Sequence, residues 1–187
     1  MGIETILSIC LGLGLSAATG FRIFVPLLVV NVAARMGLLS LAPSFEWVGG
    51  TPALVTFGLA TALEVGAYYI PWLDNFLDTV ATPASVVAGM VVAASVITGI
   101  DPYLKWTLAV IAGGGVAGAV QAVTVGTRQA SAIATAGFGN PVVSTIEMAG
   151  SLGLSMLSIL LPVLAVVLVA LFLIWAGRKV FHLRRVR

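Results

Sequence analysis

The stretch "LLPVLAVVLVALFLIWAG", residues 160–177, contains no charged residue. As an α-helix this run would be about 27 Å long, which is close to the ~30 Å hydrocarbon core of a bilayer. It is followed by "RKVFHLRRVR", residues 178–187, which holds five of the nine Lys and Arg residues of the chain. An apolar run followed by a basic cluster predicts a membrane helix with a cytoplasmic anchor.

The composition of the whole chain extends this prediction. Of the 187 residues, 60% are hydrophobic and 9% are charged, and the mean hydropathy is +1.14. These values lie far outside those of a soluble globular domain. The apolar residues occur in continuous runs, whereas a membrane β-barrel requires alternating segments of about ten residues. We therefore predict a single integral membrane domain over residues 1–187, an all-α polytopic helix bundle of about six to eight segments with some short or broken helices.

Pro, Gly and charged residues divide the chain into eight apolar segments, 3–19, 21–38, 52–70, 83–100, 103–125, 128–139, 142–158 and 160–177. The segment 128–139 would be only about 18 Å long as a helix and is too short to cross a bilayer. We expect a half-helix there. Lipid cannot satisfy the open backbone at such a break, so the segment should be enclosed by protein or line a hydrated cavity.

The distribution of Lys and Arg predicts the orientation, because positive residues favour the cytoplasmic side. With the basic tail inside and eight crossings, both termini would be cytoplasmic and the loop 71–79 would lie outside. The first residues, "MGIETILSICLGLG", lack the basic start of a signal peptide, which indicates a retained first helix. We expect the protein in the cytoplasmic (inner) membrane.

Two similar halves, residues 1–100 and 101–178, are suggested by a constant offset between small residues and an arginine. The aligned positions are Gly12, Gly20 and Arg22 with Gly118, Gly126 and Arg128. A repeat would place both arginines around a pseudo-symmetry axis, where many transporters bind their substrate. The sequence is compatible with both a parallel and an inverted repeat.

Four ionisable residues lie within apolar segments or at their edges: Arg22, Glu64, Arg128 and Glu147. A charge at the centre of a membrane helix costs about 2.5 to 3.5 kcal/mol, so each should be paired or face water. We prefer the pair Arg22 with Glu64 because both fall near the outer side. Arg128 and Glu147 are expected at different depths, which makes their pairing doubtful. Ion pairs that fix the helices and a pathway for solute or ions explain the four charges equally well.

Several polar residues surround Arg128, and most of them recur at helical spacing of three or four. One helix face would combine hydroxyls with a guanidinium, which suits a hydrated groove, an anion or a lipid phosphate. Alternatively, the hydroxyls bond to carbonyls of their own helix. The residues of this predicted groove are Thr124, Thr127, Ser131 and Thr135, with Asn140 beyond them.

Acidic residues gather in the predicted outer loop, where Asp74, Asn75 and Asp78 follow the aromatic residues Tyr68, Tyr69 and Trp72. Aromatic residues at this place are typical of a membrane interface. Oxygen ligands on one short turn could bind a cation, although two carboxylates are few for calcium. We therefore assign no metal site there.

No nucleotide-binding, nucleophile or zinc-protease motif occurs in the sequence, so we expect no cofactor and find no catalytic residue. Enzymatic activity is not excluded, but no motif argues for it. Cys10 is the only cysteine, which rules out a disulfide within the chain. The basic residues cluster in the tail, so the net charge of +2 does not indicate a nucleic-acid partner.

Three motifs, "ATGFRIFVPLLVV", "YYIPWLDNFLDTVATPAS" and "VGTRQASAIATAGFGNPVVSTIE", occur in this order before the long apolar C-terminal segment. Together they resemble domain-of-unknown-function family 4126, whose members are small integral membrane proteins without an established activity. The resemblance covers nearly the whole chain. Its motifs include Arg22, Pro71, Asp74, Asp78, Pro83, Arg128, Asn140, Pro141 and Glu147.

Two functions follow from these observations. The first is a small transporter or channel in which Arg22 and Arg128 bind an anionic or zwitterionic solute, while Glu64 and Glu147 balance charge or carry protons. The second is a lipid-binding or assembly protein, whose arginines hold phospholipid head groups or whose ion pairs only stabilise the bundle. Its partners would be the bilayer, a bound phospholipid and further copies of the chain.

Overall fold

The computed structural model describes residues 2–67 and 71–185, and within these ranges all regular structure is helical. The prediction of an all-α bundle is confirmed. Seven elements precede the last three long helices: α1 (Ile3–Thr19), α2 (Phe24–Arg35), the 3₁₀-helix η1 (Pro43–Gly49), α3 (Thr51–Ala67), α4 (Pro71–Val96), α5 (Pro102–Leu108) and the π-helical turn η2 (Ala109–Gly114). The last three are α6 (Gly115–Thr135), α7 (Asn140–Leu160) and α8 (Pro162–Arg185).

The helix boundaries follow from local chemistry. Asp101 caps α5, since its side chain accepts hydrogen bonds from the backbone N–H of Tyr103 (2.8 Å) and Leu104 (3.4 Å). Proline near the N-terminus of α7 and at the start of α8 suits a position whose N–H has no partner within the helix. The split between α7 and α8 at Pro162 is as the sequence predicts.

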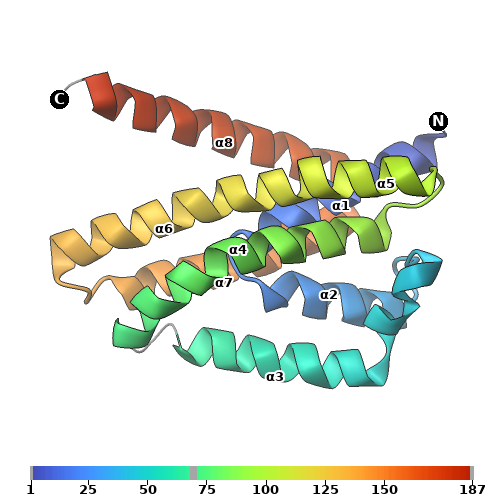
Figure 1. Ribbon diagram of the computed structural model, residues 1–187, viewed down its shortest axis with the longest axis horizontal. Coiled ribbons are helices and arrows are strands. Elements are labelled where there is room, and N and C mark those ends of the chain that lie inside the picture. The colour runs from blue at the N-terminus through green and yellow to red at the C-terminus, as the bar shows by residue number, and fades with distance from the viewer. Residues whose placement is uncertain (1, 68–70, 186–187) are drawn as a thin grey trace.

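The helices run side by side along one direction, with α1 in the interior (Figure 1). This central helix packs against α4, α6, α7 and α8. α1 and α2 contain 17 and 12 residues, or about 25 Å and 18 Å. Their connection lies inside the bundle, short of the end where α6 is joined to α7 (Figure 1). The two helices therefore form a hairpin that enters the bundle from one end and turns back within it.

Among the described residues, four helices are long and apolar enough to cross a membrane, with candidate spans at Thr79–Val96, Pro102–Thr135, Asn140–Leu160 and Pro162–Lys179. η1 and α3 would provide a fifth span if this pair, bent by 61°, is counted as one. The protein is an integral membrane protein.

The distribution of polar and apolar side chains agrees with a lipid environment. Large apolar side chains such as Leu63 and Ile133 are exposed on the outside. In the interior, Ser16 Oγ donates to the carbonyl of Gly89 on α4 (2.8 Å), and Ser151 Oγ donates to the carbonyl of Ala18 on α1 (3.0 Å). Hydrogen bonds of this kind connect helices that cannot rely on the hydrophobic effect for association in lipid.

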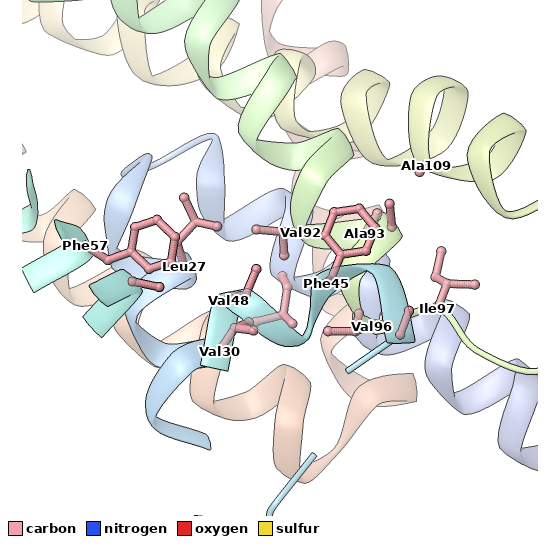
Figure 2. Close-up of a cluster of buried hydrophobic side chains, with 14 residues drawn as sticks. Leu27, Val30, Phe45, Val48, Phe57, Val92, Ala93, Val96, Ile97 and Ala109 are labelled. Atoms are coloured by element: carbon pink, nitrogen blue, oxygen red, sulfur yellow. The ribbon is translucent and has the colours of Figure 1, made fainter. Parts of the chain in front are cut away.

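An apolar cluster fills the end of the bundle at which α1 begins. Leu27 and Val30 of α2 meet Phe45 and Val48 of η1, and Val92 of α4 packs against them (Figure 2). Most of these side chains are fully buried. This packing holds the α1–α2 hairpin to α3 and α4, and the buried Asn31 of α2 adds a hydrogen bond from its side-chain amide to the carbonyl of Val48.

Two predicted boundaries are wrong. Segment 103–125 and residues 128–135 belong to one continuous helical stretch, Pro102–Thr135, and residues 136–139 form the turn before α7, so residues 128–139 form no separate half-helix. Residues 71–79 begin α4 and are not a loop, and Pro83 lies inside that helix. In both cases a helix includes residues that often end one, because a helix satisfies the backbone groups around Gly, Pro and polar residues within a membrane. The predicted run 160–177 agrees with the candidate span Pro162–Lys179, and α8 continues beyond it to Arg185.

Candidate functional site: a buried arginine cluster

The tip of the α1–α2 hairpin, residues 20–23, is pressed against α6. A Cβ atom at Gly20 would lie 2.5 Å from the carbonyl oxygen of Ala117 and 2.6 Å from Cβ of Val120. Only glycine permits this approach of the two backbones. Thr124 adds a polar contact, because its Oγ1 donates to the carbonyl of Gly20 at 3.4 Å.

The turn buries Arg22, whose side chain points into the bundle and is the largest fully buried one among the described residues. Its Nη2 donates to the carbonyl of Ser144 on α7 (2.9 Å) and to the Ser144 hydroxyl. The same nitrogen lies 3.6 Å from Oε2 of Glu147. Arg22 thus links the hairpin tip to α7 through one carbonyl, one hydroxyl and one carboxylate.

Arg128 reaches the same carboxylate from α6. Its Nε lies 3.0 Å from both Oε1 and Oε2 of Glu147, and its Nη2 also contacts Oε2. Arg128 and Glu147 are both buried. Two guanidinium groups, from segments 106 positions apart, therefore share one carboxylate. We call Arg22, Arg128, Ser144 and Glu147 the arginine cluster.

Glu64 lies beside this cluster and binds the backbone of the hairpin. Its Oε1 accepts from the N–H of Ile23 (2.8 Å), and its Oε2 accepts from the N–H of Phe24 (3.1 Å). These groups form the N-terminus of α2, where free N–H groups and the helix dipole favour a negative charge. Glu64 also interacts electrostatically with Arg22 and Arg128.

A cavity of about 430 Å³ lies next to Glu64, between the start of α2, the end of α3 and α4. Apart from this glutamate, the described residues that line it are apolar and include Ile23, Phe24, Leu63 and Ala81. The site thus combines a charged cluster, a helix N-terminus occupied by a carboxylate, and an adjoining apolar space.

The structure brings all four predicted intramembrane charges together but changes their pairing. The sequence favours Arg22 with Glu64 and makes Arg128 with Glu147 doubtful. In the structure Arg128 binds Glu147 directly, Arg22 joins the same carboxylate, and Glu64 binds backbone N–H groups. The predicted difference in depth between Arg128 and Glu147 is wrong because the prediction starts a short separate segment at Arg128, whereas α6 runs continuously through this residue.

Only part of the predicted polar groove faces the arginine cluster. Thr124 and Arg128 are buried, whereas Thr127 and Thr135 are exposed. Their hydroxyls donate within α6 to the carbonyls of Val123 (2.9 Å) and Ser131 (2.7 Å), which agrees with the alternative interpretation. Ser131 is half-buried, and Asn140 is buried at the start of α7.

The acidic residues Asp74, Asn75 and Asp78 belong to the first turns of α4. Their side chains lie outside the described part of the structure, so the expectation that these residues form no metal site stays an expectation. The arginines aligned in the proposed repeat have different surroundings, because Arg22 lies in a connection and Arg128 lies within α6.

Sequence reasoning missed Ser144, the contact of Arg22 on α7. A signal for it exists, since polar residues of α7 recur every three or four positions and form one buried stripe: Ser144, Glu147, Ser151, Ser155 and Ser158. In a membrane helix, a polar stripe of this kind faces other helices.

Comparison with known families agrees with this architecture. Residues 9–181 match the family described as "Domain of unknown function (DUF4126)". The chain belongs to this family. The match covers most of the chain and confirms the resemblance carried by the three motifs. No curated protein and no solved structure matches the chain.

Proposed function

We propose that this member of the DUF4126 family is a small membrane transporter or channel for an anionic or zwitterionic solute, and that the arginine cluster is part of its solute site. The observation that carries the proposal is the convergence of Arg22 and Arg128 on Glu147 at the tip of a hairpin inside the bundle. A buried charge is costly in a membrane, and such charges commonly mark substrate or ion pathways.

The α1–α2 hairpin, which turns back inside the bundle, supports this proposal independently of the charges. Transporters place their substrate sites where discontinuous helices end inside the membrane, and the N-terminal ends of such helices favour anionic groups. Here the N-terminus of α2 lies at the hairpin tip, next to Arg22. With two arginines and two glutamates, the site can exchange an internal ion pair for a contact with an anion or a zwitterion.

A purely structural role explains the cluster less well. A buried ion triad is weak evidence for stability, because hydrophobic residues of similar volume are often equally stabilising or better. A bundle with this much apolar surface could therefore be held together without Arg22, Arg128 and Glu147. Their presence is better explained by an interaction with a ligand.

The helix directions lead us to revise the expected topology. α1 begins and α8 ends at opposite ends of the bundle (Figure 1). We propose five passages through the cytoplasmic membrane, with the hairpin of α1 and α2 turning back inside it. The basic end of α8 would be cytoplasmic and the start of α1 would lie on the other side. This proposal replaces the expectation of two cytoplasmic termini.

Native mass spectrometry of the detergent-purified protein tests the function even while the identity of the solute is unknown. We expect a bound non-lipid molecule in the wild type and its loss in both Arg22→Gln and Arg128→Gln. The matched control is Arg35→Gln, since Arg35 is exposed and donates to Thr51 Oγ1 at 3.1 Å. This variant should keep the molecule.

Two other results would contradict the transport proposal. A phospholipid that is retained by the wild type and lost in both variants would indicate lipid binding. An absence of any ligand, combined with easier unfolding of both variants, would show that the arginines are structural. The same spectra report the mass of the assembly and so test the expected homo-oligomer.

A further inference from the structure

We propose that the Glu64 carboxylate occupies the head-group position of a monocarboxylate site at the N-terminus of α2. The ligand would be a carboxylate with an apolar tail. Its head group would replace Glu64 on the backbone, and its tail would enter the adjoining cavity. The inference rests on the proposed function, since it names the class of anion that the hairpin tip binds.

The contacts of Glu64 define the head-group position. Its two oxygens accept from two consecutive N–H groups, of Ile23 at 2.8 Å and of Phe24 at 3.1 Å. A free carboxylate has the same two oxygens at the same separation and could make the same two hydrogen bonds. The N-terminus of a helix is a ready site for an anion of this kind, and here Arg22 directly precedes it.

The cavity defines the rest of the ligand. It extends from Ile23 and Phe24 to Ala60, Leu63 and Ala81, and its volume of about 430 Å³ is within the range of small-molecule sites. Since the described residues around Glu64 in this lining are apolar, the cavity suits an aliphatic chain. A second charge on the ligand would be unfavourable beside these described apolar residues.

Thr61 provides a second indication of a ligand. It lies one turn before Glu64 on the buried face of α3 that packs against α2. Only 8% of its surface is exposed, and among the described residues its hydroxyl has no hydrogen-bond partner. A buried hydroxyl without a partner is unfavourable, so an oxygen atom of a ligand near Glu64 would improve this site.

If a ligand displaced Glu64 from the α2 backbone, the Glu64 carboxylate would not become an isolated charge in the membrane. The carboxylate interacts electrostatically with Arg22 and Arg128, and these interactions can remain when its oxygens leave the α2 backbone. The N-terminus of α2 would then be stabilised by the carboxylate of the ligand.

The test is octanoate binding to the full chain in lipid nanodiscs, measured by calorimetry for the wild type, Glu64→Ala and Glu64→Gln. Removal of the competing carboxylate should tighten octanoate binding about tenfold or more in Glu64→Ala. Glu64→Gln should give a smaller gain, because an amide still fills part of the site. Octanol and octylamine should show no comparable gain.

Two controls separate the site from general effects. Glu46→Ala removes an exposed glutamate and should bind octanoate as the wild type does. Glu64→Ala combined with Ala60→Leu fills the cavity and should lose the gain. Tighter binding of oleate than of octanoate would identify a fatty acid from the bilayer as the ligand, and the reverse order would identify a soluble monocarboxylate; either order supports the site.

The inference is overturned if Glu64→Ala binds octanoate no better than the wild type, or if octanol shows the same gain. This failure is distinguishable from failure of the proposed function. A ligand that depends on Arg22 and Arg128 in native mass spectrometry would preserve the transport proposal even if octanoate did not bind to Glu64→Ala.

Discussion

Glu147→Gln is expected to lower the free energy of unfolding by about 3 to 5 kcal/mol, the range seen when one partner of a buried ion pair is removed. Glu147 is the carboxylate that Arg22 and Arg128 share. Glutamine preserves its size but leaves two buried guanidinium groups without this counter-charge. Unfolding in mixed micelles with increasing dodecyl sulfate, followed by tryptophan fluorescence, measures the loss.

Two variants control for this effect. Glu4→Gln removes an exposed carboxylate at the start of α1 and should change stability little. The triple variant Arg22→Met, Arg128→Met and Glu147→Leu removes all three charges and should recover most of the lost stability, because hydrophobic residues can replace a buried triad. A stability of Glu147→Gln equal to that of the wild type would contradict the described cluster. The folded triple variant should also bind no solute.

Gly20→Val is expected to have the second large effect, because it forces the hairpin tip away from α6. Its Cβ would overlap the carbonyl oxygen of Ala117 at 2.5 Å, and a backbone atom cannot move aside as a flexible side chain can. Overpacking of this kind costs about 1 to 3 kcal/mol, and more where the backbone must shift. The displacement would also separate Arg22 from Arg128.

Gly58→Val in α3 is the matched control, since a Cβ at Gly58 meets no atom within 4 Å. Both variants can be measured by the same unfolding assay and by ligand content in native mass spectrometry. We expect Gly20→Val to lose stability and ligand, and Gly58→Val to keep both. Equal behaviour of the two variants would contradict the close packing of the hairpin tip on α6.

The fold class could be predicted from the sequence because it depends on long apolar runs. The run 160–177 and the break at Pro162 both appear in the structure as expected. The course of the short helices could not be predicted, since α1 and α2 are as apolar as spanning helices. Their turn inside the bundle depends on the contact of Gly20 with α6, which no local pattern indicates.

The residues of the site could be predicted more reliably than their contacts. Charged residues in apolar segments are conspicuous, and Arg22, Glu64, Arg128 and Glu147 do lie together. Their pairing depends on depth, and the predicted depth is wrong because it places Arg128 at a helix end, whereas α6 continues through this residue. The spacing of charged residues in the sequence does not indicate that a side chain such as that of Glu64 accepts hydrogen bonds from backbone N–H groups.

Cysteine accessibility at Ser144 tests the central claim, that the arginine cluster lies on a solute pathway, most directly. In a Cys10→Ser background, Ser144→Cys and Ser155→Cys place a thiol at two buried positions of α7, of which only Ser144 contacts Arg22. The membrane-impermeant, anionic reagent methanethiosulfonate ethylsulfonate is applied to whole membranes. A pathway that opens to water predicts much faster labelling at Ser144→Cys than at Ser155→Cys. Equal protection of both thiols in correctly folded protein would contradict the account.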